Sequence, residues 1–187
     1  NHATITASNC LFSNSASNNI LLTYGGSYSF DYCTVPNATG QTSSISMDNY
    51  TCILNELGLC KEGTVQTNKA ILRVNNSILS GLDTDEINLT DAYDGKQEAY
   101  FQYSFNNSVL RVSDLLKEEY FTQRIKDRYI LANNDKLYVN EGKSDFRLDS
   151  VSVAKGIAKP IPNIVDDLLG NLRKPDKTDA GCYEYLP

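Results

Sequence analysis

Apolar and polar residues alternate along several short stretches of the chain, and four of these stretches align as blocks of eight residues. Each block has apolar residues at its first and third positions, a polar corner, a small Cys or Ser at its sixth position and an apolar residue at its eighth. The blocks are residues 5–12, 28–35, 72–79 and 103–110. This pattern predicts a strand, a tight bend and a second strand, because successive side chains of a strand point to opposite faces.

The corner of three blocks carries an asparagine, at Asn9, Asn76 and Asn107. Asparagine tolerates left-handed backbone angles and can bond to its own neighbours, so we expect these three side chains to stack as a ladder. One feature conflicts with this register, because three apolar residues would point outward from it: Leu11, Ile78 and Val109. Either covering segments shield them or the register is displaced by one residue.

The block starts lie 23 (28 minus 5), 44 (72 minus 28) and 31 (103 minus 72) residues apart. These intervals fit one coil of about 22 residues, two coils, and one coil with an insertion. We therefore expect an all-β, right-handed parallel β-helix, a pectate-lyase-like solenoid of about four to five coils, with the unaligned coil in residues 45–55. An antiparallel sandwich also produces short alternating strands and stays open as an alternative.

The remaining segments interrupt or end the repeat. Insertions are expected near residues 54–66 and 112–133, and the second should contain a short helix that begins at Ser113-Asp114. From Asp145 onward the repeat is lost and prolines and glycines become frequent. We expect residues 1–144 to form the coils and residues 145–187 to be a capping tail of the same domain, because the last coil would otherwise leave its backbone groups unpaired.

The composition and the net charge limit the kinds of partner that the protein is expected to bind. The chain has 17 basic and 23 acidic residues, a net charge of -6 and no basic run, so nucleic acid is not expected to bind. It has no stretch of about 18 apolar residues, so no membrane span is expected in it. The first predicted strand has no neighbour to cover its edge, which predicts a fragment that follows N-terminal β-helix coils of the same protein.

The five cysteines are an odd number, so at least one is free. Cys52 and Cys60 could close a short loop in an oxidising compartment, and the sequence leaves their state open.

Four runs in the tail carry a family resemblance. They are D-F-R-L at 145–148, S-V-A-K-G at 152–156, D-L-L-G-N-L-R at 167–173 and D-A-G-C-Y-E-Y at 179–185. In this order they resemble the C-terminal signature of right-handed β-helix proteins of the choice-of-anchor Q type, which reads D-[FY]-R-L, S-P-A-I-x-x-G, D-x-x-G-x-x-R and D-I-G-A-Y-E. Residues 76–81, N-S-I-L-S-G, resemble a coil segment of the same family.

The chain departs from the family pattern at Val153, Lys155, Ala180 and Cys182, which makes it a divergent member. The family is common among exported proteins of Bacteroidetes, often lipoproteins. The resemblance therefore implies an exported protein at the bacterial cell surface, in the periplasm or outside the cell.

The tail also suggests how the cap is held. Charged side chains of Asp167, Arg173 and Asp179 could pin it through charge-assisted hydrogen bonds, and Tyr183 could lie on the last coil.

No catalytic motif stands out. The single histidine is His2, and the sequence lacks the fingerprints of serine hydrolases, zinc proteases, P-loop proteins and Rossmann folds. Polysaccharide lyases abstract a proton beside a uronate carboxylate with a Lys or Arg base, and the candidates for that role are Arg73 and Arg111. Each is more simply interpreted as a solubilising residue.

Binding residues are equally sparse. The acidic residues Asp83, Asp85 and Asp91 could supply oxygen ligands for Ca²⁺, but their spacing is not that of an EF-hand, so we expect a solvated loop without a metal or cofactor. Tyr93 and Tyr100 are candidate platforms for sugar rings. The sequence thus favours glycan binding or cell-surface scaffolding without an evident catalytic site. The alternative is a fragment of a polysaccharide lyase or glycoside hydrolase whose groove lies mostly in the preceding coils.

Overall fold

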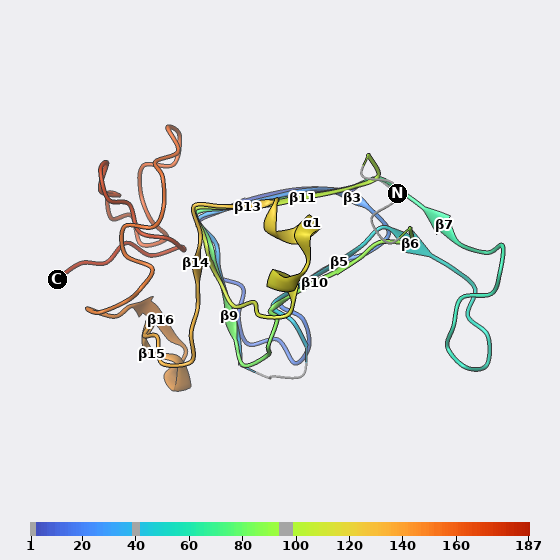
Figure 1. The fold of residues 1–187 in the computed structure, drawn as a ribbon. Coiled ribbons are helices and arrows are strands. Elements are labelled where there is room, and N and C mark those ends of the chain that lie inside the picture. Colours follow the sequence, from blue (N-terminus) through green and yellow to red (C-terminus); the bar gives the residue numbers. More distant parts are fainter. Residues whose placement is uncertain (1–2, 39–41, 94–98) are drawn as a thin grey trace.

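The computed structural model describes residues 3–38, 42–93 and 99–187, and short strands form most of its regular structure (Figure 1). Three sheets are parallel. In spatial order the first contains β1 (Thr4–Ser8), β3 (Gly26–Asp31), β8 (Ala70–Asn75), β11 (Phe101–Asn106) and β13 (Ile125–Lys126). The second contains β14 (Tyr129–Ile130), β12 (Val109–Leu110), β9 (Ile78–Gly81) and β4 (Thr34–Asn37). The third contains β10 (Ile87–Thr90), β5 (Ile45–Asp48) and β2 (Ile20–Leu22).

Two antiparallel pairs lie outside these sheets. One is β6 (Tyr50–Thr51) with β7 (Gln66–Thr67), and the other is β15 (Tyr138–Asn140) with β16 (Asp145–Leu148). The helical turns are η1 (Leu115–Lys117), α1 (Glu119–Thr122) and η2 (Glu141–Lys143).

The register of the five-stranded sheet confirms the alignment of the four sequence blocks. Ile5 pairs with Tyr28, Tyr28 with Leu72, and Leu72 with Tyr103, which are the first positions of successive blocks. Alternate residues of these strands therefore point into the molecule in line with one another, as the apolar pattern requires.

The polar corner of each block is a single residue in the left-handed region. Five residues share this conformation at φ between 47° and 53°: Asn9, Tyr32, Asn76, Asn107 and Asp127. The expected stack of Asn9, Asn76 and Asn107 is wrong, because Tyr32 occupies the corner between the first two. A side-chain ladder runs one residue earlier instead. Asn75 donates to Asp31 at 2.8 Å, and Asn106 donates to Asn75 at 3.1 Å.

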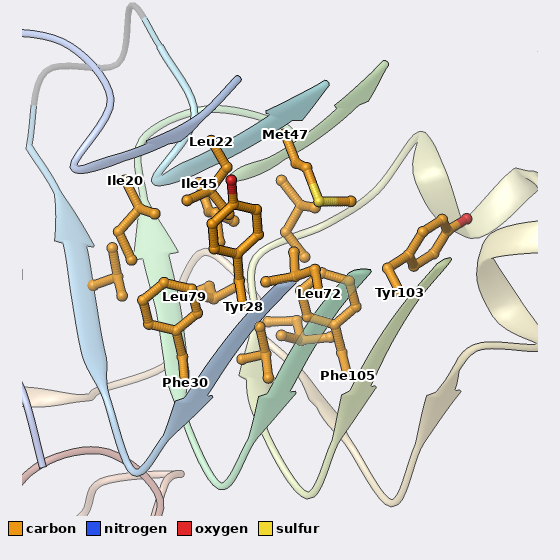
Figure 2. Close-up of a cluster of buried hydrophobic side chains, with 14 of the residues drawn as sticks. Ile20, Leu22, Tyr28, Phe30, Ile45, Met47, Leu72, Leu79, Tyr103 and Phe105 are labelled. Atoms are coloured by element: carbon orange, nitrogen blue, oxygen red, sulfur yellow. The ribbon is translucent and has the colours of Figure 1, made fainter. Parts of the chain in front are cut away.

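The main core lies between the three parallel sheets. Figure 2 shows side chains from all three converging there, among them Ile20, Phe30, Ile45, Leu72 and Leu79. Phe121 of α1 is also buried in this cluster, so the short helix closes part of the core.

A second apolar cluster explains the residues whose direction conflicted with the sequence pattern. Ile78 and Val109 point out of the main core but are fully buried, and Leu11 packs beside them. They are covered by the segment that follows β14, including Tyr138, Phe146 and Ala180. Shielding by covering segments, the first of the two possibilities, is therefore correct.

The expectation of one continuous right-handed parallel β-helix of four to five coils is wrong. The strands of the described residues belong to five separate sheets of two to five strands, three parallel and two antiparallel. In this part of the chain only two successive passes, β3 to β5 and β8 to β10, give a strand to all three parallel sheets. After β12 the chain enters η1 and α1, so it adds no strand to the third sheet.

Two finer expectations fail for related reasons. No coil separates the second and third blocks, because β3 pairs directly with β8; the 44-residue interval is lengthened by the β6–β7 hairpin. The short helix expected to begin at Ser113-Asp114 is present as η1 and α1, but the expectation that residues 112–133 are an insertion is wrong, because they also contain β13 and β14, which pair with β11 and β12.

The β6–β7 hairpin carries a disulfide between Cys52 and Cys60, with Cα atoms 5.5 Å apart. It projects away from the three sheets (Figure 1). Cys10, Cys33 and Cys182 are free. None of the helices in the described segments is long and apolar enough to cross a membrane.

Candidate functional site

The strands of the four-stranded sheet all end at the same edge, and a depression of about 530 Å³ opens there. Because parallel strands have their carboxyl ends side by side, the residues that follow the paired positions come together although they are far apart in sequence. Its lining includes Asn37 from β4, Gly81 from β9, Arg111 just after β12 and Leu131 just after β14. The β15–β16 hairpin forms the opposite wall with Glu141 and Phe146.

Arg111 is fixed in the wall of this depression. Its Nε donates to the Asp83 carbonyl at 3.3 Å and its Nη1 to the Leu131 carbonyl at 3.2 Å, while Nη2 donates to the Asn133 side-chain oxygen. These bonds use three of the five N–H groups of a guanidinium. The positive group is therefore held in a defined plane at the edge of the sheet.

Glu86 lies behind the same wall and is fully buried. Its carboxylate accepts hydrogen bonds from the Ser44 backbone N–H at 2.7 Å, the Asp83 backbone N–H at 2.9 Å and the Asn37 side-chain amide at 3.2 Å. The Ser44 hydroxyl lies 2.9 Å from it. These neutral donors replace the water that the carboxylate loses on burial.

Gly81 fits between this carboxylate and the depression only because it has no side chain. A Cβ at this position would lie 1.9 Å from Glu86 Oε1 and 2.7 Å from the Asn37 carbonyl oxygen. Glu86 thus holds the Asn37 side chain and leaves no room for a side chain at Gly81. Both residues line the depression, whereas Glu86 is not part of its lining.

Asp135 supplies a further polar group at the rim. Its carboxylate accepts the backbone N–H of Ala132 at 2.7 Å, which holds the turn that follows β14. A hydrogen bond to Asp135 also raises the pKa of the Tyr129 hydroxyl. Apolar side chains complete the lining at Leu82, Leu131 and Leu137.

The two arginine candidates lie on different sheets. Arg73 is in the middle of β8, exposed on the outer face of the five-stranded sheet between Ser29 and Ser104 of the neighbouring strands. Arg111 lies at the edge of the four-stranded sheet. The structure therefore brings Arg111, and not Arg73, to a depression.

Two of the three candidate metal-ligating carboxylates, those of Asp85 and Asp91, accept hydrogen bonds from other groups. The Asp85 carboxylate accepts backbone N–H groups of Ser113 at 2.6 Å and Asp114 at 3.1 Å, and so holds the start of η1. Asp91 accepts the Asn49 side-chain amide at 2.7 Å. The Asp83 backbone bonds to Glu86 and Arg111. Within the described ranges, three or more His, Cys, Asp or Glu side chains nowhere gather in a way that could hold a metal ion.

The candidate sugar platforms do not lie together with Arg111 either. The Tyr93 hydroxyl lies 3.4 Å from the Thr67 hydroxyl beside the β6–β7 hairpin. Tyr100 is 47% exposed just before β11. His2 lies outside the described residues.

The candidate capping residues form a buried polar cluster. Arg173 donates to Asn9 Oδ1 at 2.7 Å and to the Gly181 carbonyl at 3.0 Å, and its Nη1 lies 3.5 Å from the buried carboxylate of Glu184. Asp179 accepts the backbone N–H groups of Gly156 and Tyr185, both at 2.8 Å.

Asp167 belongs to the same cluster. It accepts the backbone N–H groups of Leu169 at 2.8 Å, Asn171 at 2.9 Å and Glu184 at 2.9 Å. Burial would raise the pKa of Asp167, but these backbone donors outweigh burial and lower it. Tyr183 is partly exposed, packs against the second apolar cluster and lines a smaller depression with Arg147.

The tail approaches the sheets closely at Gly181, which has a φ of +90°. A Cβ there would lie 2.6 Å from Thr34 Oγ1 and 2.7 Å from Ile78 Cδ1. The Gly181 N–H donates to the Asn76 carbonyl at 2.8 Å, and the next N–H, of Cys182, donates to Thr34 Oγ1 at 2.9 Å. Glycine is thus required both by the backbone angle and by the contact.

Sequence reasoning missed most residues of the depression, including Asn37, Ser80, Asn133, Asp135 and Glu141. A signal for part of the set was present, because Asn37, Ser80 and Arg111 each follow the apolar end of an aligned block by one or two residues. Comparison of the chain with family models, with curated proteins and with solved structures gives no match.

Proposed function

We propose that the protein binds carbohydrate without cleaving it, in the depression beside Arg111. The observation that carries this proposal is the combination of fixed polar groups and apolar walls at one sheet edge. Arg111 and Asp135 are held by the hydrogen bonds described above, and Leu82, Leu131 and Leu137 lie among them. Sugars present hydroxyl groups around apolar C–H faces, and such a mixed lining suits both.

The size of the depression is compatible with a small ligand or with one end of a polymer. Its volume of about 530 Å³ lies within the ~300–1,000 Å³ common for ligand sites. The lining carries the positive charge of Arg111 and the negative charges of Asp135 and Glu141, so an acidic sugar would gain a charge-assisted hydrogen bond where its carboxylate contacts the guanidinium. We therefore expect polysaccharides that contain uronic acids to bind more tightly than neutral ones.

We further propose that the protein is exported and acts at a bacterial cell surface, in the periplasm or outside the cell. The disulfide between Cys52 and Cys60 supports this, because such bonds persist mainly in oxidising compartments. The resemblance of the tail to choice-of-anchor Q proteins supports it as well, and membership of that family stays a prediction.

The proposal is tested on an array of plant and bacterial polysaccharides that includes neutral and uronic acid polymers. We expect the wild-type chain to bind uronic acid polymers and Arg111→Ala to weaken that binding at least tenfold. The matched control is Arg73→Ala, which removes the same charge from another sheet and should bind as the wild type does.

A second variant tests the same depression in case Arg111→Ala fails to fold. Glu141 is exposed at the start of η2 on the opposite wall, so Glu141→Lys should leave the fold intact and change the affinity for acidic polymers. Absence of binding to every polymer, or equal binding by Arg111→Ala and Arg73→Ala, would show the proposal to be wrong. If unsaturated products are released, as detected by ultraviolet absorbance, the protein is a lyase and the proposal of binding without cleavage is wrong.

A further inference from the structure

One wall of the depression beside Arg111 is also the wall of a second hollow. This hollow has a volume of about 310 Å³ and is lined by residues 135–141, so we call it the 135–141 hollow. Asp135, Leu137 and Glu141 line both the depression and this hollow. Because three lining residues are shared, the two lie next to each other along the segment that runs from the turn after β14 to the start of η2.

The charged residues of these two neighbouring sites alternate in sign. Arg111 lines only the depression, and Lys136 lines only the 135–141 hollow. Asp135 and Glu141 lie at the boundary, since they belong to both. A ligand that extends from the depression into the hollow therefore meets positive, negative and positive groups in turn.

The protein does not neutralise these charges by pairing them with one another. The Arg111 guanidinium donates to two backbone carbonyls and to the side-chain oxygen of Asn133, all of them neutral acceptors. Across residues 3–38, 42–93 and 99–187, none of the four charged side chains forms an ion pair. A ligand with complementary charges can therefore supply the counter-charges.

We infer, on the basis of the carbohydrate binding proposed above, that the two hollows together bind a glycan in which acidic sugars alternate with sugars that carry a protonated amine. One carboxylate of the glycan contacts the Arg111 guanidinium. The ammonium group of the next sugar contacts the carboxylates of Asp135 and Glu141. A second carboxylate contacts the Lys136 ammonium group in the 135–141 hollow.

A polymer made only of acidic sugars suits this lining less well. Its carboxylates gain from Arg111 and Lys136, but a carboxylate at the boundary meets Asp135 and Glu141, and like charges repel. An ammonium group at the same place turns the repulsion into attraction. Its charge-assisted hydrogen bonds are also stronger than those between neutral groups.

Apolar side chains between the charges suit a chain of sugars. Leu137 lines both sites, and Val139, which is 44% exposed, lines the 135–141 hollow. These side chains can contact the C–H faces of successive sugar rings while the charged groups fix the orientation of the chain. Two adjoining hollows therefore favour a chain over a single small molecule.

The inference is tested with two tetrasaccharides of alternating glucuronic acid and glucosamine, which differ only in whether the amines are free or acetylated. Binding to the full chain is measured by isothermal titration calorimetry at about pH 6, where a free amine of this kind is protonated. We expect the free-amine form to bind at least tenfold more tightly. Acetylation removes the positive charges of the ligand and leaves its two carboxylates in place.

Glu141→Gln tests the negative boundary, since Glu141 is exposed and the change removes its charge but not its length. The preference for the free-amine form should fall at least threefold, and the acetylated form should bind no more weakly than it does to the wild type. Glu62→Gln is the matched control. It removes the same charge from the exposed loop of the β6–β7 hairpin and should keep the wild-type preference.

The length of the ligand tests the 135–141 hollow. Lys136→Gln should weaken binding of the free-amine tetrasaccharide and leave binding of the corresponding disaccharide unchanged. Lys61→Gln, in the exposed loop of the β6–β7 hairpin, is its control and should bind both as the wild type does. A disaccharide that binds the wild type as tightly as the tetrasaccharide would overturn the role of the second hollow.

The remaining outcomes separate this inference from the proposed function. Equal affinity for the free-amine and acetylated tetrasaccharides overturns the inference, and the proposed function stands if Arg111→Ala weakens the binding of both. If neither tetrasaccharide and no uronic acid polymer binds, the proposed function is wrong and the inference fails with it.

Discussion

The guanidinium carbon of Arg173 lies 3.8 Å from the centre of the Tyr32 ring. Tyr32 is the one left-handed corner residue between the five-stranded and four-stranded sheets that is neither Asn nor Asp. Its ring gives the guanidinium of the tail a flat surface to pack on. The Tyr32 hydroxyl also donates to the Lys159 carbonyl at 2.9 Å, so one side chain contacts two segments of the tail.

Arg173 and Glu184 form a buried ion pair, and burial opposes the charge of both. It lowers the pKa of Arg173 and, together with the nearby Asp179 carboxylate, raises the pKa of Glu184. Removing Arg173 leaves the buried Glu184 carboxylate with the half-exposed Lys174 ammonium, 3.8 Å away, as its cationic partner, which compensates a buried charge less well. We expect Arg173→Met to reduce the free energy of unfolding by about 3–5 kcal/mol.

The double variant Arg173→Met with Glu184→Gln distinguishes charge from packing. If the loss in Arg173→Met comes from the less well compensated Glu184 carboxylate, the double variant should recover part of it in urea unfolding followed by circular dichroism. A double variant that is destabilised by the sum of the two single changes would contradict the ion pair as the cause.

Asp167 should make stability fall in acid. Its folded-state pKa is lowered, so its contribution is complete above the unfolded pKa of 3.8 and is lost as the pH falls through the folded value. We expect Asp167→Asn to cost about 2 kcal/mol at pH 7, since it weakens hydrogen bonds to a charged acceptor. The difference from wild type should shrink between pH 4 and pH 2, and equal differences at pH 7 and pH 2.5 would exclude this linkage.

The corner asparagines should not be equivalent. Asn76 is left-handed at φ 53° and its side chain pairs with the Lys159 backbone, donating at 2.6 Å and accepting at 3.0 Å. Asn107 has nearly the same backbone angle, φ 51°, without that pairing. Alanine at either position costs about 1–2 kcal/mol for the left-handed backbone.

At Asn76 the lost pairing should add about 2 kcal/mol, at roughly 1 kcal/mol for each hydrogen bond. Asn76→Ala is therefore expected to melt below Asn107→Ala in differential scanning calorimetry. Asn76→Asp, which tolerates the left-handed backbone and can still accept from the Lys159 N–H, should melt above Asn76→Ala. Equal melting temperatures for the two alanine variants would assign the whole effect to the backbone.

The strands were predictable to the extent that their side chains alternate. The aligned blocks reproduce the pairing of Ile5, Tyr28, Leu72 and Tyr103, because inward positions tolerate only apolar residues. The fifth strand pair, β13 and β14, was missed because Arg128 stands at the position where each of the other blocks has a small Cys or Ser. The spacing between the second and third blocks also led to a wrong prediction. The 44-residue interval contains a disulfide-bonded hairpin and not an additional coil.

The depression was less predictable than the strands. Its residues come from the ends of four strands and from the β15–β16 hairpin, and only pairing brings them together. Arg111 was found as a charged residue beside a block, but its partners Leu131 and Asn133 follow the strand that the sequence pattern concealed. The same reasoning explains the tail: Arg173 was recognised, whereas its contacts Asn9 and Tyr32 lie at the other end of the chain.

The five cysteines should separate into three classes of reactivity. Burial raises the pKa of Cys33 to about 12 and that of Cys182 to about 11, so at pH 8 only about one in ten thousand Cys33 thiols is ionised. Cys10 is only partly buried, and Cys52 and Cys60 are joined. Under native, non-reducing conditions iodoacetamide should therefore modify Cys10 first.

Mass spectrometry of the alkylated chain checks this order. One modification is expected in the native state, three after unfolding in urea without reductant, and five after unfolding with reductant. Rapid native alkylation of Cys33 would show that its layer of the core opens on the time scale of the experiment. Five modifications without reductant would contradict the disulfide, and with it the support that the hairpin gives to an exported protein.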